Sequence, residues 1–179
     1  MPDDHRPDID TASAFSLVLT GHRGTEGRSH PYHVALFDSK PVRLTNGPFV
    51  LLAQLAEARL TSYAGYLQLR RGDDPNTLRL GIHRLRRQID AALGAEAGME
   101  WVETGMGTEY RLAVSVDNLG VDPGFSEIPW SLLAEDLRDL LVERCHVVES
   151  DTDNAIAAQS PRNGRAFQGT LACLKAEHA

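Results

Sequence analysis

The stretch from residue 75 to residue 112 changes its hydrophobic period once, and this change constrains the fold more than any other feature of the chain. Four apolar residues in the first half recur at steps of four, three and four, as on one face of a helix: Leu78, Ile82, Leu85 and Ile89. In the second half, two β-rich runs are joined through Gly105-Met106-Gly107, which predicts a β-hairpin over residues 101–114. An amphipathic helix followed by a hairpin indicates an α+β fold.

Both ends of this helix carry sequence signals. Asp74 precedes Pro75; an aspartate side chain accepts the unpaired amides of a first helical turn, and proline is tolerated as the first helical residue. Gly94 is a suitable stop. The sequence therefore predicts a helix over residues 75–93. Gly81 inside it costs about 1 kcal/mol relative to alanine, and we expect this glycine to allow close approach of a backbone or a partner.

The predicted helix is rich in arginine. Four arginines fall within nine residues: Arg79, Arg84, Arg86 and Arg87. One interpretation is a surface helix with a solvated basic face. The other is a helix that enters a DNA groove with the hairpin beside it. In the second case we expect His83, Arg84 and Arg87 to face DNA. Thr77 and Arg79 would lie near phosphates, and Arg86 would be partly structural.

Three motifs follow one another around this helix. The first is Leu44-Thr45 with Phe49, the second is Ile82-His83-Arg84-Leu85-Arg86, and the third runs from Thr104 through Gly105-Met106-Gly107 to Tyr110-Arg111. In this order and spacing they resemble the winged-helix DNA-binding domain of the OmpR/PhoB response-regulator family, in which they open the first helix, end the recognition helix and form the wing. The resemblance covers about residues 34–114.

The resemblance implies a winged helix-turn-helix with a small N-terminal antiparallel sheet, three helices and a C-terminal β-hairpin wing, followed here by a helical C-terminal extension. It implies sequence-specific binding of double-stranded DNA in transcriptional control, with helix 75–93 in the major groove. The DNA-binding residues expected from the helix and the wing are Thr77, Arg79, His83, Arg84, Arg87, Thr108 and Arg111. Only about forty residues precede the winged helix, and we expect no receiver domain there.

The chain departs from the family at four positions. Pro48 and Arg79 stand where the family often has an acidic residue, Met106 where it often has arginine, and Glu109 where it often has glycine. Methionine cannot make the contact that an arginine makes in the minor groove, and a glutamate nearby repels phosphate. These departures keep a second interpretation open, in which the winged helix has lost DNA binding and is a protein–protein interaction module.

The charge of the chain is divided unevenly. The net charge is −7 over 179 residues. Residues 40–116 contain ten basic and eight acidic residues and so carry +2, which leaves −9 for the flanks. The centre of the chain therefore has the sign that contact with DNA requires, and acidic flanks would limit non-specific binding.

Composition predicts a cytoplasmic protein. The chain has no run of eighteen apolar residues that could span a membrane, and its acidic, polar start does not have the pattern of a signal peptide. The two cysteines, Cys145 and Cys173, are too few for a disulfide framework and fit a reducing compartment.

Residue patterns divide the chain into four parts. We expect disorder over residues 1–13, the winged-helix domain over 14–116, a linker over 117–128 and a helical extension over 129–179. Within the domain, the sequence predicts strands at 15–19, 32–37 and 41–44, and helices at 49–59 and 62–71, with Thr45 as a cap of the first helix. Residues 151–165 are polar, and a last short helix is expected over 167–175.

The extension is predicted to contain a helix over residues 129–144 with an apolar side. That side carries Trp130, Leu133, Leu137, Leu140 and Leu141. It either covers the winged helix in the same chain, forms a homodimer contact or docks another protein. A dimer would place two recognition helices on repeated half-sites and gain affinity by linkage.

Three segments superficially suggest catalysis or ligand binding. Residues 21–29 lack the final Gly-Lys of a phosphate-binding loop, because Glu26 and Gly27 stand there, so we expect a mobile hairpin loop. His30 and His33 lack a second pair of metal ligands and are expected in a polar loop. Cys145 and His146 are adjacent and would point about 100° apart on a helix, so Cys145 is expected to be a small buried apolar residue. We predict no enzyme activity, no cofactor and no metal.

Overall fold

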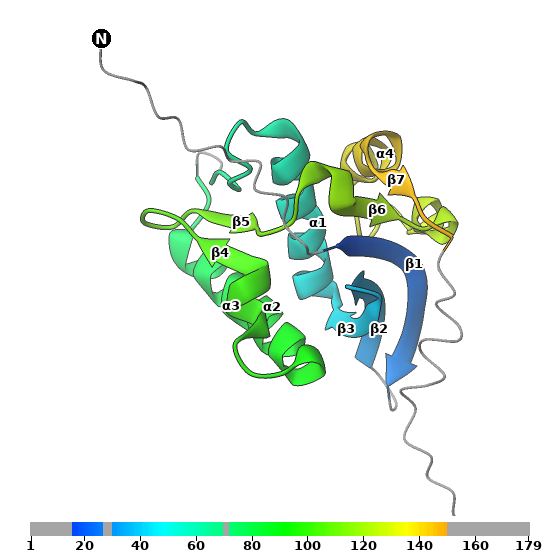
Figure 1. The fold of residues 1–179 in the computed structure, drawn as a ribbon, viewed down its shortest axis with the longest axis horizontal. Helices are drawn as coiled ribbons and strands as arrows, with labels where there is room; N and C mark the ends of the chain where they lie inside the picture. Colours follow the sequence, from blue (N-terminus) through cyan, green and yellow to red (C-terminus); the bar gives the residue numbers. More distant parts are fainter. Residues whose placement is uncertain (1–15, 27–29, 70–71, 150–179) are drawn as a thin grey trace, which may run out of the picture.

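The computed structural model describes residues 16–26, 30–69 and 72–149 of the chain and has an α+β fold (Figure 1). Its main sheet has five strands in the order β3-β2-β1-β6-β7. The first three are antiparallel neighbours, as predicted: β1 (Leu17–Glu26), β2 (His30–Phe37) and β3 (Lys40–Thr45). The predicted disorder at 1–13, the polar stretch at 151–165 and the helix at 167–175 lie outside the described residues.

Strand β1 runs further than the sequence suggested. The prediction of a mobile loop from residue 21 is wrong for residues 21–26, which continue β1 and pair with β2 after a shift in register between Leu19 and Arg23. Gly21 makes this path possible, because a Cβ atom there would stand 2.0 Å from the carbonyl oxygen of Gly124. Its amide also donates to Asp122 Oδ1 at 2.8 Å. Residues 27–29 are outside the described part.

The prediction of a linker after residue 116 is wrong. Strand β6 (Leu119–Val121) pairs in parallel with β1, and β7 (His146–Val147) pairs in parallel with β6. Short 3-10 helices, η1 (Val116–Asn118) and η2 (Pro123–Glu127), flank β6. Leu119, Val121 and Phe125 are almost completely buried, so this segment belongs to the core of the fold.

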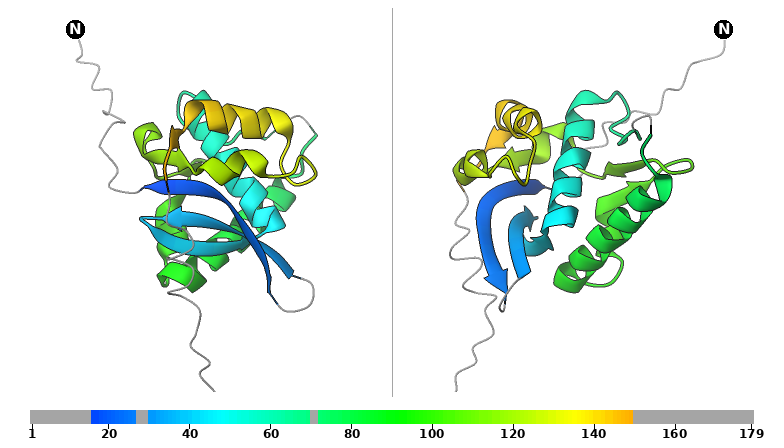
Figure 2. Two further views of the ribbon diagram at one scale, coloured as in Figure 1. Left: turned by 90° about the vertical axis from the view of Figure 1, so that its right-hand side faces the viewer. Right: turned by 180° about the vertical axis from the view of Figure 1, so that it is seen from behind.

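Helix α1 (Asn46–Thr61) occupies the centre of the molecule. It lies between the sheet and helix α2 (Pro75–Leu93), as the view from behind in Figure 2 shows. Its apolar residues occur on all sides because neighbours cover it all round. Thr45 is at the cap position, as predicted, but its side chain does not cap the helix; its hydroxyl instead accepts a hydrogen bond from Gln88 Nε2 at 3.0 Å.

The prediction of a second helix over residues 62–71 is wrong. Residues 62–64 form a turn, and the chain then runs without helix to Leu69, the last described residue before Gly72. Gly65 has a φ of +71°, which lies outside the helical region. Leu67 forms an isolated antiparallel bridge with Tyr110. No helix therefore separates α1 from α2 in the described residues.

Helix α2 begins and ends where the sequence predicted. The side chain of Asp74 accepts hydrogen bonds from the amides of Asn76 and Thr77, Pro75 follows the cap, and Gly94 ends the helix. A short helix, α3 (Ala97–Trp101), leads into the predicted hairpin of β4 (Val102–Thr104) and β5 (Tyr110–Leu112).

The C-terminal helix is shorter than predicted. Helix α4 spans Glu135–Arg144, so the expected helical start near residue 129 is wrong. Leu133, Leu137 and Leu141 are buried within the same chain, and α4 lies against α1 (Figure 2). Trp130 is 79% exposed and does not belong to this buried face. The leucine face therefore covers the core in cis and is not free for a second copy.

Candidate nucleic-acid interface

The candidate interface lies on the side of α2 that points away from the core. Ile82, Leu85 and Ile89 are buried at 0–1% exposure and fix the rotation of the helix about its axis. Successive helical residues are about 100° apart, so the residues opposite this stripe face solvent. They are Asn76, Leu80, His83, Arg84 and Arg87, with Arg79 at their edge.

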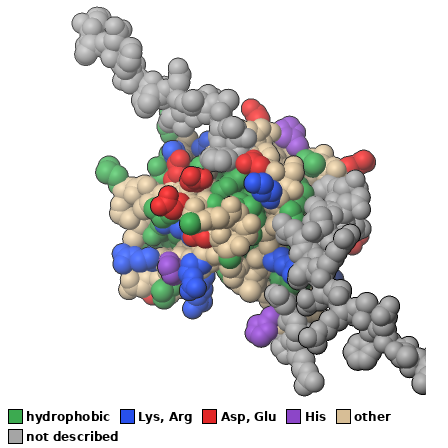
Figure 3. Space-filling model, turned by 60° about the horizontal axis from the view of Figure 1, so that its bottom comes forward, with side chains coloured by type: hydrophobic (Ala, Val, Ile, Leu, Met, Phe, Trp, Pro, Cys, Tyr) green, Lys and Arg blue, Asp and Glu red, His purple; other side chains and the backbone are tan. Residues whose placement is uncertain are grey.

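The outward arginines of α2 differ from the other arginines of the chain in their contacts. Within the described residues, Arg79, Arg84 and Arg87 make no hydrogen bond or ion pair. Figure 3 shows Lys and Arg side chains and a histidine gathered at the lower left, on the side where α2 lies. Their charges are available to a partner, and an anionic partner gains most from them.

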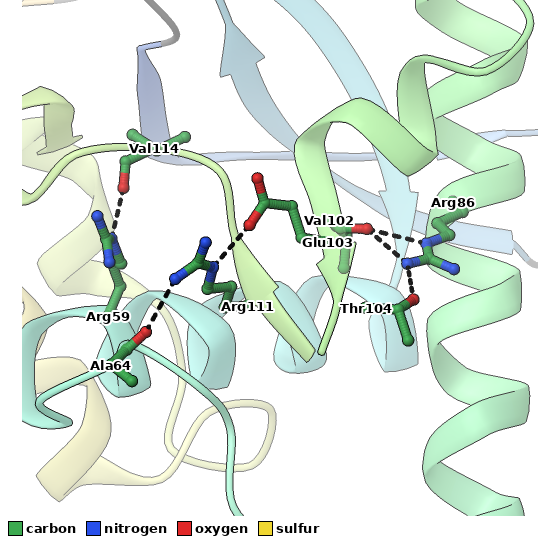
Figure 4. A network of polar contacts seen from close by, with 8 residues as sticks. All are labelled: Arg59, Ala64, Arg86, Val102, Glu103, Thr104, Arg111 and Val114. Atoms are coloured by element: carbon green, nitrogen blue, oxygen red, sulfur yellow. Dashed lines mark hydrogen bonds and ion pairs between the residues drawn. The ribbon is translucent and has the colours of Figure 1, made fainter. Parts of the chain in front are cut away.

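Arg86 is structural. Its guanidinium donates to the carbonyl oxygen of Val102 from Nε (3.1 Å) and Nη2 (2.5 Å), and to Thr104 Oγ1 from Nη2 (2.7 Å). It also lies over the ring of Tyr110, 5.7 Å from the centroid. Figure 4 shows the hydrogen bonds, which fasten the hairpin to α2. Burial lowers the pKa of Arg86. The expectation that Arg86 is partly structural is confirmed.

Arg111 was predicted to bind DNA, and the structure places it inside the base of the hairpin. Its Nε pairs with Glu103 Oε2 at 2.6 Å, and Nη1 donates to the carbonyl oxygen of Ala64 at 3.5 Å (Figure 4). The guanidinium also lies over the Tyr66 ring, 4.9 Å from its centroid. The charge of Arg111 is therefore paired within the protein.

Arg59 is a third arginine that is hydrogen-bonded within the protein, and its sequence position predicted no such role. Its Nε donates to the carbonyl oxygen of Val114 at 2.6 Å and so ties α1 to the segment that follows β5 (Figure 4). The basic residue in the last turn of α1 was visible in the sequence, but its partner was not, because 55 residues separate the two.

The tip of the hairpin is exposed but carries no cation. The Met106 side chain is 89% exposed, Glu109 is exposed and Thr108 is half-buried. The turn closes through a hydrogen bond from the Gly105 amide to the carbonyl oxygen of Glu109 (2.8 Å) and through Gly107, whose φ is +75°. Of the two residues predicted for the wing, only Thr108 is therefore near the tip.

The N-terminal end of α2 is already occupied by a carboxylate. Asp74 accepts hydrogen bonds from the Asn76 amide (3.0 Å) and from the Thr77 hydroxyl (3.0 Å). The backbone hydrogen bond from Asn76 is the main reason that the pKa of Asp74 lies below its usual value. Thr77, predicted to lie near phosphate, therefore already donates its hydroxyl to an anion of its own chain.

A groove lies between α1 and α2, beside this face. Its volume is about 780 Å³. Apolar and glycine residues from both helices and from the connecting segment form much of its wall: Pro48, Leu51, Leu67, Leu78, Leu80 and Gly81. A Cβ atom on Gly81 would stand 3.1 Å from Leu51 Cδ2, so the close approach expected at this glycine is made by α1.

The remaining candidate residues of the sequence, His30, His33 and Cys145, lie on β2 and at the end of α4. His30 and His33 lie on β2 and not in a loop, which corrects that prediction; His33 is 5% exposed and stacks on Phe49 with ring centroids 4.7 Å apart. Cys145 is a free, buried thiol, as predicted, and burial raises its pKa to about 11. Within the described ranges, no group of three or more His, Cys, Asp or Glu side chains could hold a metal ion.

Comparison with protein-family models, with curated proteins and with solved structures found no match to this chain. In the part of the chain that the structure describes, no helix has both the length and the apolar character that crossing a bilayer would require.

Proposed function

We propose that this protein is a sequence-specific regulator of transcription that binds double-stranded DNA through α2. In this proposal the chain is a winged helix of the OmpR/PhoB type, with α2 in the major groove and the β4–β5 hairpin as the wing. The observation that carries it is the set of arginines at 79, 84 and 87, which lie on the outward side of α2 without partners among the described residues. A helix of 19 residues is about 28 Å long, enough to lie along a major groove.

The arginines differ in whether they have partners within the protein, and this difference supports the proposal. Arg86 and Arg111 hold the hairpin against α2 and the residues after α1, so the hairpin has a defined position beside the helix. His83, Arg84 and Arg87 then point to the same side as Leu80 and are the residues proposed to face DNA. The proposal involves no catalytic step and no cofactor, and it places the protein in the cytoplasm.

The second candidate is a winged-helix module that binds other proteins. The hairpin tip favours it, because Met106 offers apolar surface and Glu109 would repel phosphate. Trp130, at 79% exposure, is a further apolar residue open to a protein partner. A homodimer would use surfaces such as this one, since Leu137 and Leu141 of α4 are buried in the same chain.

A titration of mixed genomic DNA fragments at two salt concentrations separates the two candidates. If Arg79, Arg84 and Arg87 each neutralise one phosphate, the logarithm of the binding constant falls with the logarithm of salt concentration at a slope of about −2.7. Between about 50 and 200 mM salt this slope lowers affinity roughly 40-fold. A chain that binds no DNA even at the lower salt concentration would contradict the proposal and favour the interaction module.

A further inference from the structure

Leu80 lies at the centre of the outward side of α2. Leu78 and Ile82, two members of the apolar stripe, are each two residues from it, which corresponds to about 200° of rotation about the helix axis. The Leu80 side chain therefore points almost directly away from the core. It is 56% exposed, whereas Ile82 is 1% exposed.

The side chains around Leu80 on this side of α2 are polar or basic. Four of them are exposed: Asn76, His83, Arg84 and Arg87. The acidic residue of α2, Asp90, accepts a hydrogen bond from the Gly98 amide at 2.8 Å. Leu80 is therefore the one large apolar side chain on a face of α2 whose charge attracts an anionic partner.

Leu80 also borders the groove between α1 and α2, whose lining includes three carboxylates: Glu57, Asp73 and Asp74. Asp74 stands six residues before Leu80, about 9 Å along the helix, and its oxygens accept hydrogen bonds from Asn76 and Thr77. Arg84 lines the same groove one turn after Leu80, in the opposite direction. The basic part of the outward side therefore extends from Leu80 towards the C-terminal end of α2.

The base edges of a major groove present one kind of apolar group, the C5-methyl group of thymine, beside hydrogen-bond donors and acceptors. A leucine side chain forms no hydrogen bonds, so among these groups the methyl is its partner. Arg84 and Arg87 follow Leu80 by four and seven residues, about 6 and 10 Å along the helix. With base pairs about 3.4 Å apart, the three side chains reach neighbouring base pairs of one site when α2 follows the groove.

We propose that Leu80 is a specificity-determining residue that packs against the C5-methyl group of thymine when α2 lies in the major groove. The contact favours a site with thymine at this position over one with cytosine, which carries no methyl group there. Burial of one methyl group corresponds to roughly a fourfold change in the binding constant. This role rests on the proposed function, because it requires α2 to enter the groove.

Replacing thymine by uracil tests this contact, because uracil keeps the hydrogen-bonding groups of thymine and lacks only the methyl group. The probe is the pool of genomic fragments that the full-length chain retains after repeated rounds of selection, amplified once with thymidine triphosphate and once with deoxyuridine triphosphate. Leu80→Ala removes the apolar side chain, and Leu80→Gln replaces it by a polar one of similar size. Met99→Ala is the matched control, because Met99 lies on α3 and is 59% exposed.

The parent and Met99→Ala should bind the thymine pool roughly four times as tightly as the uracil pool. Leu80→Ala and Leu80→Gln should bind the two pools equally, with a thermal midpoint close to that of the parent. Comparing all four proteins on the same two pools cancels any effect of the methyl group on the shape of the DNA.

The other outcomes separate this role from the proposed function. Equal binding of both pools by the parent overturns the role of Leu80 and leaves the proposed function standing. A preference for thymine that persists in both Leu80 variants assigns the methyl contact to another residue and overturns the role as well. A parent chain that retains no DNA fragment overturns the proposed function, and the role of Leu80 with it.

Discussion

At the scale of single residues, burial and hydrogen bonding decide what each arginine does. Arg86 and Arg87 are neighbours on α2, yet Arg86 uses its donors on Val102 and Thr104, whereas Arg87 is without a partner in the described residues. Arg111 stands opposite Glu103 in the register of the hairpin, so a cross-strand ion pair holds it. This pairing follows from the hairpin geometry and could have corrected its assignment to DNA.

Arg86→Ala should lower the free energy of unfolding by about 2 kcal/mol, because the carbonyl group of Val102 loses its side-chain partner and the hairpin loses its attachment to α2. Arg87→Ala is the matched control and should change stability by less than about 0.5 kcal/mol. Urea unfolding of both variants measures the difference. Equal effects of the two substitutions would mean that the contacts of Arg86 do not stabilise the fold.

His33 should make stability depend on pH. Burial is the main cause that lowers its pKa, and the hydrogen bond to Asn46 opposes this in part. His33 in the unfolded chain therefore binds a proton at a pKa near 6.5, whereas His33 in the folded chain binds it only at a lower pH. Stability is full above that pH and falls as the pH drops towards the folded pKa, by at most about 1.4 kcal/mol per pH unit.

Unfolding titrations from neutral pH down to about pH 5, below the ordinary histidine pKa, measure this dependence. His33→Gln should flatten the pH profile in this range, whereas His83→Gln, on the outward side of α2, should leave it intact. A profile that is the same in the parent and in His33→Gln would show that another group is responsible.

At the scale of elements, the wing and α2 contribute unequally to the proposed DNA contact. Met106 and Glu109 give the hairpin tip no positive charge, so affinity should come mainly from α2. Met106→Arg with Glu109→Gly should tighten DNA binding, most on A·T-rich fragments whose minor groove is narrow. The salt slope should steepen by about 0.9, the contribution of one phosphate contact.

Met106→Gln with Glu109→Gly is the control for this experiment, because it removes the acidic side chain without adding a cation. It should leave the salt slope close to that of the parent. If the arginine variant changes neither affinity nor slope, the hairpin does not lie near DNA, and the interaction module becomes the better account.

At the scale of the whole molecule, the C-terminal part is integral to the fold. The described apolar core is one cluster that joins Ile82 and Trp101 to Leu133 and Leu141. Leu141→Ala should therefore destabilise the entire fold by about 2–5 kcal/mol. The fluorescence of Trp101, measured in a Trp130→Phe background, reports this loss of stability from a different part of the core. If Leu141→Ala leaves the unfolding midpoint of Trp101 unchanged, α4 unfolds separately.

Local signals made α2, the hairpin and the first three strands predictable. The Asp74-Pro75 start, the apolar stripe and Gly94 all lie within or beside the helix they define. The parallel pairing of β6 with β1 was hidden, since it joins Leu19 to Val121 across about a hundred residues. The sequence predicted a helix in this region because local signals cannot reveal the contact that holds residues 62–69 in a non-helical path. That contact is the bridge from Leu67 to Tyr110, which is also long-range. The outward residues of α2 were predictable from the stripe alone, whereas the contacts of Arg111 with Ala64 and Tyr66, far away in the sequence, were not.

Charge reversal on α2 tests the central claim most directly. Arg84→Glu with Arg87→Glu should abolish binding to genomic DNA fragments and leave the thermal midpoint nearly unchanged, because neither side chain has a partner among the described residues. Lys40→Glu with Arg144→Glu changes the net charge by the same amount, on β3 and α4, and should retain binding. The account is contradicted if the α2 variant binds DNA as tightly as the parent, or if the control variant loses binding to the same extent.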